Sequence, residues 1–172
     1  MDPVKLLEAN IIAKLSYIPS HAHGMVVSKL PDALLINSNL PCDMFNQILC
    51  LDIQNQQQWQ DIKAVFAKKK HPFALWCGFS NQTAQTSNLI DALDLPPLES
   101  ELGMIARISM MKRVRFNHDL DIKPLRSMGE LKDLVAVMQG LFVDDQEAIA
   151  HYFLDNQALF LDPLSPLCFY VA

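Results

Sequence analysis

Two histidines near the start of the chain have a spacing that metal sites sometimes use. His21 and His23 lie two residues apart, so on an extended strand their imidazoles would point the same way. A protein metal site needs three or four ligands, and no third ligand type lies close in the sequence. Gly24 follows directly and favours a solvated loop. The sequence therefore predicts no metal site here.

Paired acidic residues and an isolated cysteine are the other candidates for chemistry. Glu99 and Glu101 share an orientation, but a carboxylate pair does acid–base work only in a pocket that raises a pKa, and these follow a proline pair in a loop. Cys77 stands in an apolar run without a histidine or basic neighbour, as a buried thiol does. Asp144 and Asp145 are expected to cap a helix. No catalytic residue is predicted.

Asn46 is the one candidate site residue. In an alternating segment it shares a face with Met44 and Ile48, where its amide could contact a ligand in a substrate cleft. The alternative is structural, because buried amides usually bond neighbouring backbone groups. Both interpretations are kept as hypotheses.

Composition excludes several classes of protein. Of 172 residues, 51% are hydrophobic and 19% are charged, which is enough to bury a core, and the formal net charge is −5. The basic runs 68–70 and 112–115 lack interleaved aromatic residues, so no nucleic-acid partner is expected. The chain shows no signal peptide and no apolar run of membrane-spanning length, and its four cysteines form no C-x-x-C pair. We therefore expect no membrane association and a reducing, cytoplasmic location.

Local patterns in residues 1–116 predict alternating helices and strands. Asp2 and Pro3 begin a helix that is expected to end before Pro19. A hairpin over 25–39 turns at Pro31-Asp32, and a strand over 44–53 follows. The remaining expected elements are a helix over 55–70, a strand covered on both faces over 73–78, a helix over 83–95 and a strand over 103–110.

The polar stretch 115–121 is the expected linker to a second part, which begins with a short strand over 122–126. A helix over 127–142 opens with a capping box of Ser127 and Glu130. A second helix over 144–160 and a strand over 166–172 complete the chain. The residues of the first of these helices with core spacing are Leu131, Leu134, Val135, Met138, Leu141 and Phe142. Strands and helices in this order predict an α+β fold with a mixed, largely antiparallel sheet flanked by helices.

The order and spacing of several short motifs resemble a bacterial group within the GNAT superfamily of N-acetyltransferases, whose members carry a GNAT-like half before the catalytic domain. The likeness spans roughly residues 40–172, and the chain departs from the usual pattern at Cys77 and Phe79. The residues that carry it are Phe45, Asn46, Pro72, Phe73, Trp76, Gly78, Glu101, Met104, Ala106 and Ile122.

The resemblance implies a GNAT-like sheet with residues 73–78 as its central strand and Trp76 buried beneath a helix. It implies an N-terminal domain over 1–116 and the opening elements of a catalytic-type domain over 117–172. The intact protein would transfer the acetyl group of acetyl-CoA to a small-molecule or peptide amine. The family binds the coenzyme A pyrophosphate with a Gln/Arg-x-x-Gly-x-Gly/Ala loop before a helix.

None of the five glycines of this chain makes such a loop. We therefore expect the chain by itself to be non-catalytic and to carry no cofactor site. The alternative is a free-standing interaction or ligand-sensing module that has lost catalysis. Unpaired strand edges over 122–126 and 167–172 would favour a homodimer.

Overall fold

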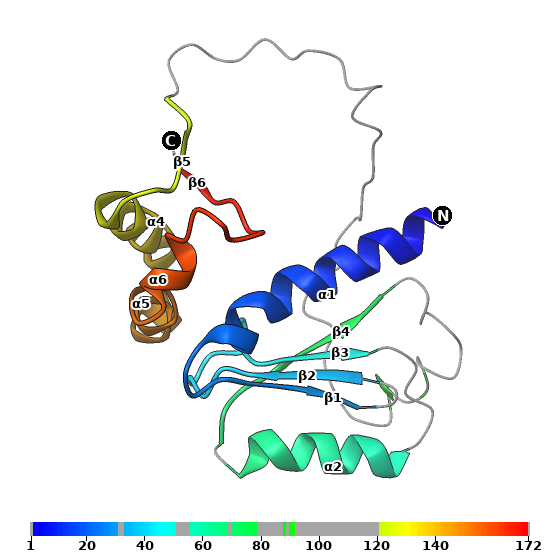
Figure 1. Cartoon of the computed structure of the whole chain (residues 1–172). Coiled ribbons are helices and arrows are strands. Elements are labelled where there is room, and N and C mark those ends of the chain that lie inside the picture. Colours follow the sequence, from blue (N-terminus) through cyan, green and yellow to red (C-terminus); the bar gives the residue numbers. More distant parts are fainter. Residues whose placement is uncertain are drawn as a thin grey trace. The chain divides into compact units, whose positions relative to one another are not determined.

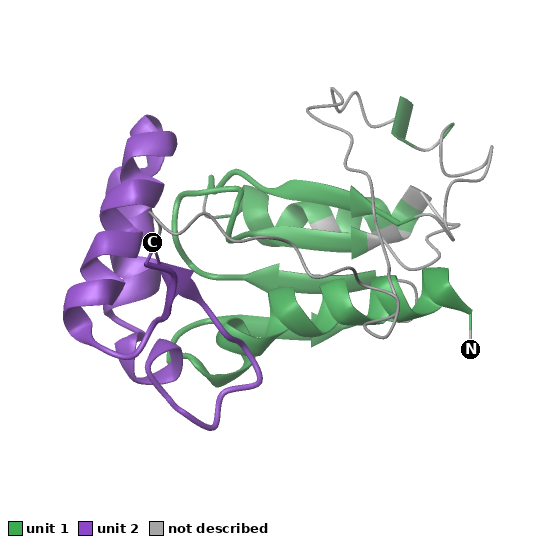
Figure 2. Cartoon of the chain, turned by 90° about the horizontal axis from the view of Figure 1, so that it is seen from above, with its two compact units in different colours: residues 1–105 green, residues 106–172 purple. Residues whose placement is uncertain are grey.

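A computed structural model of the chain describes residues 2–30, 33–50, 56–68, 70–78, 88, 90, 91 and 121–171. The chain divides into two compact units, residues 1–105 (unit 1) and 106–172 (unit 2), which Figure 2 draws in different colours. The predicted linker over 115–121, the strand over 103–110 and most of the helix over 83–95 lie outside the described residues. Residues 88, 90 and 91, within that predicted helix, are helical.

Unit 1 contains two long helices and four strands in the predicted order. Its sheet runs β1-β2-β3-β4, with antiparallel pairs β1–β2 and β2–β3 and a parallel pair β3–β4. This is the predicted mixed, largely antiparallel sheet. The elements are α1 (Pro3–His21), β1 (Val26–Lys29), β2 (Ala33–Asn37), β3 (Gln47–Cys50), α2 (Gln56–Ala67) and β4 (Ala74–Cys77).

Helix α1 begins where the sequence predicts and ends later. The carboxylate of Asp2 accepts a hydrogen bond from the Val4 N–H (3.0 Å), and Pro3 occupies the first turn, where its missing N–H leaves no bond unmade. The predicted end before Pro19 is wrong, because the helix continues to His21. Proline removes one helical hydrogen bond here, within the last turn, and the burial of Ile18 and Pro19 offsets that loss.

The sheet of unit 1 is covered on both faces. Alternate residues of the strands point to opposite sides, and Figure 1 shows α1 on one face and α2 on the other. The cluster on the α2 face consists of Ala33, Leu35, Ile48, Trp59 and Phe66, with Leu75 and Cys77 packed against it. The cluster on the α1 face consists of Leu34, Ile36 and Leu49, with Ile12, Leu15 and Trp76 packed against it. Two-sided burial explains why β2 is apolar at four successive positions.

Strand β4 differs from the expectation in the burial of its tryptophan. It lies at one end of the described strands, and the strand predicted over 103–110 lies outside the described residues, so the central position of β4 stays a prediction. Trp76 was expected to be buried and is half-buried, although it packs on the α1-face cluster. The fully buried tryptophan is Trp59 of α2. Packing against the clusters on both faces of the sheet accounts for the apolar character of this strand.

Unit 2 is a small helical group joined to a two-stranded ribbon. Ser127 and Glu130 form the predicted capping box, and β5 and β6 pair antiparallel. The helices lie side by side in Figure 1. The elements are β5 (Lys123–Pro124), α4 (Met128–Leu141), the 3-10 helix η3 (Val143–Asp145), α5 (Gln146–Leu154), α6 (Gln157–Phe160) and β6 (Tyr170–Val171).

Two predictions for unit 2 are wrong. The single helix expected over 144–160 is interrupted after Leu154, where the Asn156 amide donates to the Tyr152 carbonyl (2.8 Å) and competes with helical bonding. The final strand is two residues long rather than seven, because prolines and a turn at Asp162 occupy the preceding segment. The aromatic rings of Phe153, Phe160 and Phe169 pack there instead, with centroids 4.8 and 5.2 Å apart.

The two faces of α2 give a direct test of this packing. Phe66 is 1% exposed within the α2-face cluster, and its neighbour Val65 is 37% exposed. Phe66→Ala is expected to lower the free energy of unfolding by about 3–5 kcal/mol. Val65→Ala is expected to change it by less than about 1 kcal/mol. Urea denaturation of the full chain measures both, and equal losses would contradict the assignment of the buried face.

The capping box of α4 predicts a pH dependence. Hydrogen bonds from the Arg126 N–H (2.8 Å) and the Ser127 hydroxyl (2.9 Å) hold the pKa of Glu130 below its ordinary value of 4.5. A lowered folded-state pKa contributes stability above the unfolded value, and that stability is lost as pH falls through the folded-state pKa. Thermal melting between about pH 6 and 2 should show a smaller acid loss for Glu130→Gln than for wild type. Glu147→Gln, at a side chain 94% exposed, is the matched charge control and should behave as wild type.

Candidate functional site

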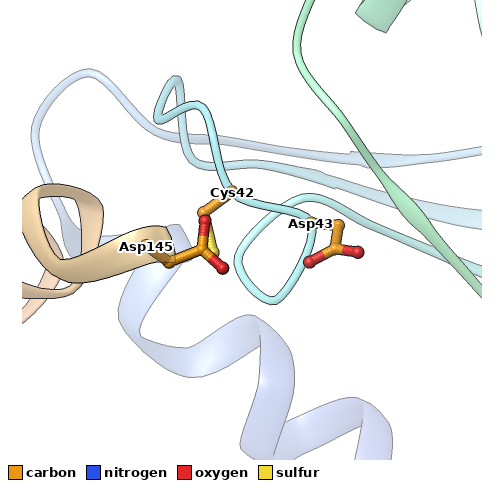
Figure 3. Close-up of side chains that lie close together, drawn as sticks. All are labelled: Cys42, Asp43 and Asp145. Atoms are coloured by element: carbon orange, nitrogen blue, oxygen red, sulfur yellow. The ribbon is translucent and has the colours of Figure 1, made fainter. Parts of the chain in front are cut away.

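Asn46 lies in a tight turn immediately before β3, rather than within an alternating strand. The turn is closed by hydrogen bonds from the Phe45 N–H to the Cys42 carbonyl (3.3 Å) and from the Asn46 N–H to the Asp43 carbonyl (3.2 Å). Figure 3 labels Cys42 and Asp43 on this segment; Asp145, also drawn there, belongs to unit 2. Cys42 and Phe45 are buried, which anchors the turn against the core.

The side chain of Asn46 is fully buried and makes four hydrogen bonds. Its Oδ1 accepts from the Ser38 N–H (3.0 Å) and the Ser38 hydroxyl (2.9 Å). Its Nδ2 donates to the Leu40 carbonyl (2.7 Å) and the Pro72 carbonyl (3.0 Å). We call this arrangement the Asn46 junction. An amide group offers two acceptor and two donor positions, and all four are used.

The junction joins three segments that are distant in the sequence. Residues 38–40 follow β2, Asn46 precedes β3, and Pro72 precedes β4. The Asn46 carbonyl also accepts from the Ala74 N–H (2.9 Å) at the first residue of β4. The structural interpretation accounts for the full bonding capacity of the side chain, so the substrate-cleft role predicted for Asn46 has no support from its hydrogen bonding.

Three buried side-chain atoms in the described part of the chain have no hydrogen-bond partner: Gln47 Oε1, Trp59 Nε1 and His71 Nδ1. Such atoms are expected to be rare, and they mark places where water or a ligand can bind. Gln47 shares the sheet face of Leu49, whereas Trp59 packs on the opposite face. Because the Gln47 and Trp59 atoms belong to different faces, these two do not form one site.

The other residues considered from the sequence lie in separate places. The exposed His21 ring hydrogen-bonds the Tyr17 carbonyl through Nδ1 (2.7 Å), one helical turn earlier. Cys77 packs on the α2-face cluster. Asp145 stands at the N-cap of α5 without a side-chain capping bond, because η3 leads directly into the helix. The predicted Glu99 and Glu101 pair lies outside the described residues.

One hollow in unit 2 is small. A hollow beside β5 and the segment 162–169 encloses about 20 Å³, which is room for about one water molecule. The hollow is therefore too small for a coenzyme or an amine substrate.

Burial raises the pKa of the Tyr152 hydroxyl well above its usual range, so this tyrosine stays neutral and cannot act as a phenolate.

The start of α4 does not fit the pyrophosphate of coenzyme A. Binding there would need free N–H groups at the helix N-terminus, where the helix dipole favours an anion. The Glu130 carboxylate lies at this end of the helix and accepts from the Arg126 and Ser127 N–H groups, just before the first helical residue, at 2.8 Å each. A phosphate would meet a negative charge in place of a donor. The start of α4 therefore offers no support for an acetyl-CoA site.

The end of α4 carries a feature that the sequence analysis assigned wrongly. Leu141 and Phe142 have core spacing, yet they are 69% and 40% exposed. Val137, one turn before Leu141, is 60% exposed, and Val143 is 68% exposed. The sequence does contain a signal for this exposure. Apolar residues lie on more than one side of the helix, whereas a helix that buries a single face needs them on one side only.

No family model, curated protein or solved structure matches this chain. The resemblance to the GNAT group therefore stays a prediction. None of the helices in the described ranges has the length and apolar character required to cross a membrane.

Replacing Asn46 by aspartate tests the junction with almost no change in shape. The two donors to the Leu40 and Pro72 carbonyls would be lost, and a buried carboxylate would face two carbonyl oxygens. Asn46→Asp is expected to reduce the free energy of unfolding at pH 7 by about 3 kcal/mol or more. The folded state would raise the pKa of the new carboxyl group, so this loss should shrink as pH falls and the group is protonated.

Asn37→Asp is the matched control. The Asn37 Oδ1 accepts a hydrogen bond from the Asn39 N–H (2.9 Å), and an aspartate at this position can accept the same bond. Urea titrations of both variants at about pH 5 and pH 7.5 separate the two cases. If Asn46→Asp behaves like Asn37→Asp at both values, the junction does not stabilise the fold.

Proposed function

We propose that this chain is the N-terminal region of an acetyl-CoA-dependent N-acetyltransferase of the GNAT type, and that it is not catalytic by itself. The observation that carries the proposal is the mixed sheet of unit 1. The segment 71–78, which contains much of the resemblance, includes β4. This strand pairs parallel with β3, and α2 connects the two strands. The two other pairs are antiparallel, as in the sheet that the resemblance implies.

In this proposal the acetyl-transfer chemistry belongs to a part of the intact protein that follows these residues. Acetyl-CoA would supply the acetyl group, and a small-molecule or peptide amine would accept it. Unit 1 would brace the catalytic domain or shape its acceptor cleft, since its buried polar junction serves the fold. The location would be the reducing cytoplasm, as the lack of a C-x-x-C pair in the sequence predicts.

The second candidate is an interaction or ligand-sensing module without catalysis. Its support is the group of exposed apolar side chains at the end of α4. Apolar clusters on a protein surface commonly mark sites where another molecule binds. Under this alternative the chain acts through that surface, and no acetyl group is transferred.

Titration calorimetry with acetyl-CoA tests the first part of the proposal. The 172-residue chain is expected to show no saturable binding up to about 1 mM ligand, a concentration corresponding to about −4 kcal/mol. The physical reason is that a carboxylate occupies the α4 N-terminus and the glycine-rich loop is missing. Saturable binding at micromolar concentration would contradict it.

The native protein distinguishes the two candidates. An antibody raised against the chain should recognise a polypeptide larger than 19.4 kDa in the source cells. After purification, that polypeptide should release coenzyme A thiol from acetyl-CoA when mixed amines are supplied. A native species of 19.4 kDa without thiol release would favour the interaction module.

A further inference from the structure

The turn between α4 and α5 presents a group of exposed apolar side chains. We call the group Val137, Leu141, Phe142 and Val143 the apex patch. Val137 and Leu141 are one helical turn apart, so they lie on the same side of α4. Their exposed fractions of 60% and 69% compare with buried Leu131 and Val135 on the inner side of the same helix.

Hydrogen bonds hold the apex patch in place. The Gln139 amide donates to the Gln146 carbonyl (2.8 Å), and the Gln146 amide donates to the Gln139 carbonyl (3.3 Å). The Phe142 N–H donates to the Met138 carbonyl (2.9 Å), which completes the end of α4. An apolar surface fixed in this way loses little conformational entropy when it binds a partner.

The charge around the patch is negative. Residues 121–172 contain eight acidic and three basic side chains, a formal net charge of −5, which equals the charge of the whole chain. Residues 1–120 are therefore balanced. Asp133 lies one turn before Val137, Asp144 follows Val143, and both are exposed. Lys132 is the exposed basic residue of α4, while Lys123 is paired with Asp121 at 2.6 Å.

This charge decides between possible occupants. A second copy would bring together two segments 121–172, each with a formal net charge of −5, which opposes association. A membrane surface attracts apolar helices flanked by lysine and arginine, whereas this patch is flanked by Asp133 and Asp144. A helix with one apolar face and flanking basic residues matches both the apolar side chains of the patch and the negative charge beside them. We infer that the apex patch docks a basic amphipathic helix of a partner protein.

A designed peptide tests this inference on the full chain. The probe is a fluorescein-labelled 14-residue peptide of leucine and lysine with a helical apolar face. Its controls are a leucine and glutamate peptide with the same pattern and a leucine and lysine peptide of scrambled order. Fluorescence anisotropy should show saturable binding of the probe, at least about tenfold tighter than either control. Equal binding of the glutamate peptide would overturn the inference.

Substitutions then locate the site. The double variant Val137→Gln/Leu141→Gln should weaken probe binding at least about tenfold. Leu164→Gln is the matched control, because Leu164 is 88% exposed in the same unit outside the patch, and binding should be unchanged. Asp133→Asn/Asp144→Asn should weaken binding severalfold and reduce its dependence on salt. Equal weakening by Leu164→Gln would show non-specific adsorption and would overturn the inference.

Two further measurements identify other occupants. Thermal melting of the double variant should match wild type; a clear drop would mean that the chain covers the patch itself. Sedimentation at micromolar concentration should give a monomer in both proteins. A wild-type dimer that the double variant dissociates would assign the patch to a second copy. Either result would replace the partner helix as the occupant.

Discussion

Four hydrogen bonds from one buried amide hold the connections of the unit 1 sheet together. Asn46 binds backbone groups of Ser38, Leu40 and Pro72, which lie after β2 and before β4. An antiparallel hairpin needs only a local turn, whereas the parallel strand β4 must return across a helix before it can pair. A contact that fixes the start of β4 beside the start of β3 therefore sets the register of the parallel pair. The cost of burying the amide is offset because each of its polar positions has a partner.

Two-sided coverage follows from that register. Once β4 is aligned with β3, Leu75 and Cys77 reach the α2-face cluster, and Trp76 reaches the α1-face cluster. The two clusters use alternate residues of the same strands, so neither helix could be lost without exposing half of each strand. The sheet therefore depends on both helices, and the polar positions of the Asn46 amide are all used within unit 1.

Helix α4 of unit 2 has a capped N-terminus and exposed apolar side chains near its C-terminus. The capping box places the Glu130 carboxylate at the start of α4, where its negative charge opposes the binding of a phosphate. At the other end, paired glutamine amides hold Leu141 and its neighbours outward. The same helix is therefore unsuited to anion binding at its start and suited to apolar contact at its end. This contrast supports a role for unit 2 in association, in an intact acetyltransferase or in a separate module.

Local signals in the sequence determined the elements whose stability is local. Asp2 and Pro3 begin α1, Ser127 and Glu130 begin α4, and β1 and β2 pair antiparallel as the predicted hairpin. The α+β class and the mixed sheet also followed from the order of the patterns. The missing glycine-rich loop could be established from the sequence alone, because it depends on which residues are present.

Only the tertiary structure decided where side chains lie when several positions fit the same pattern. The sequence left both a cleft and a structural role open for Asn46, and only the structure shows its amide bonded to the carbonyls of Leu40 and Pro72. Leu141 has core spacing, but the turn into α5 ends the buried face before it is reached. Helix α1 passes through Pro19 because burial of the final turn outweighs one lost hydrogen bond. In each case long-range packing, which local periodicity does not encode, determined the outcome.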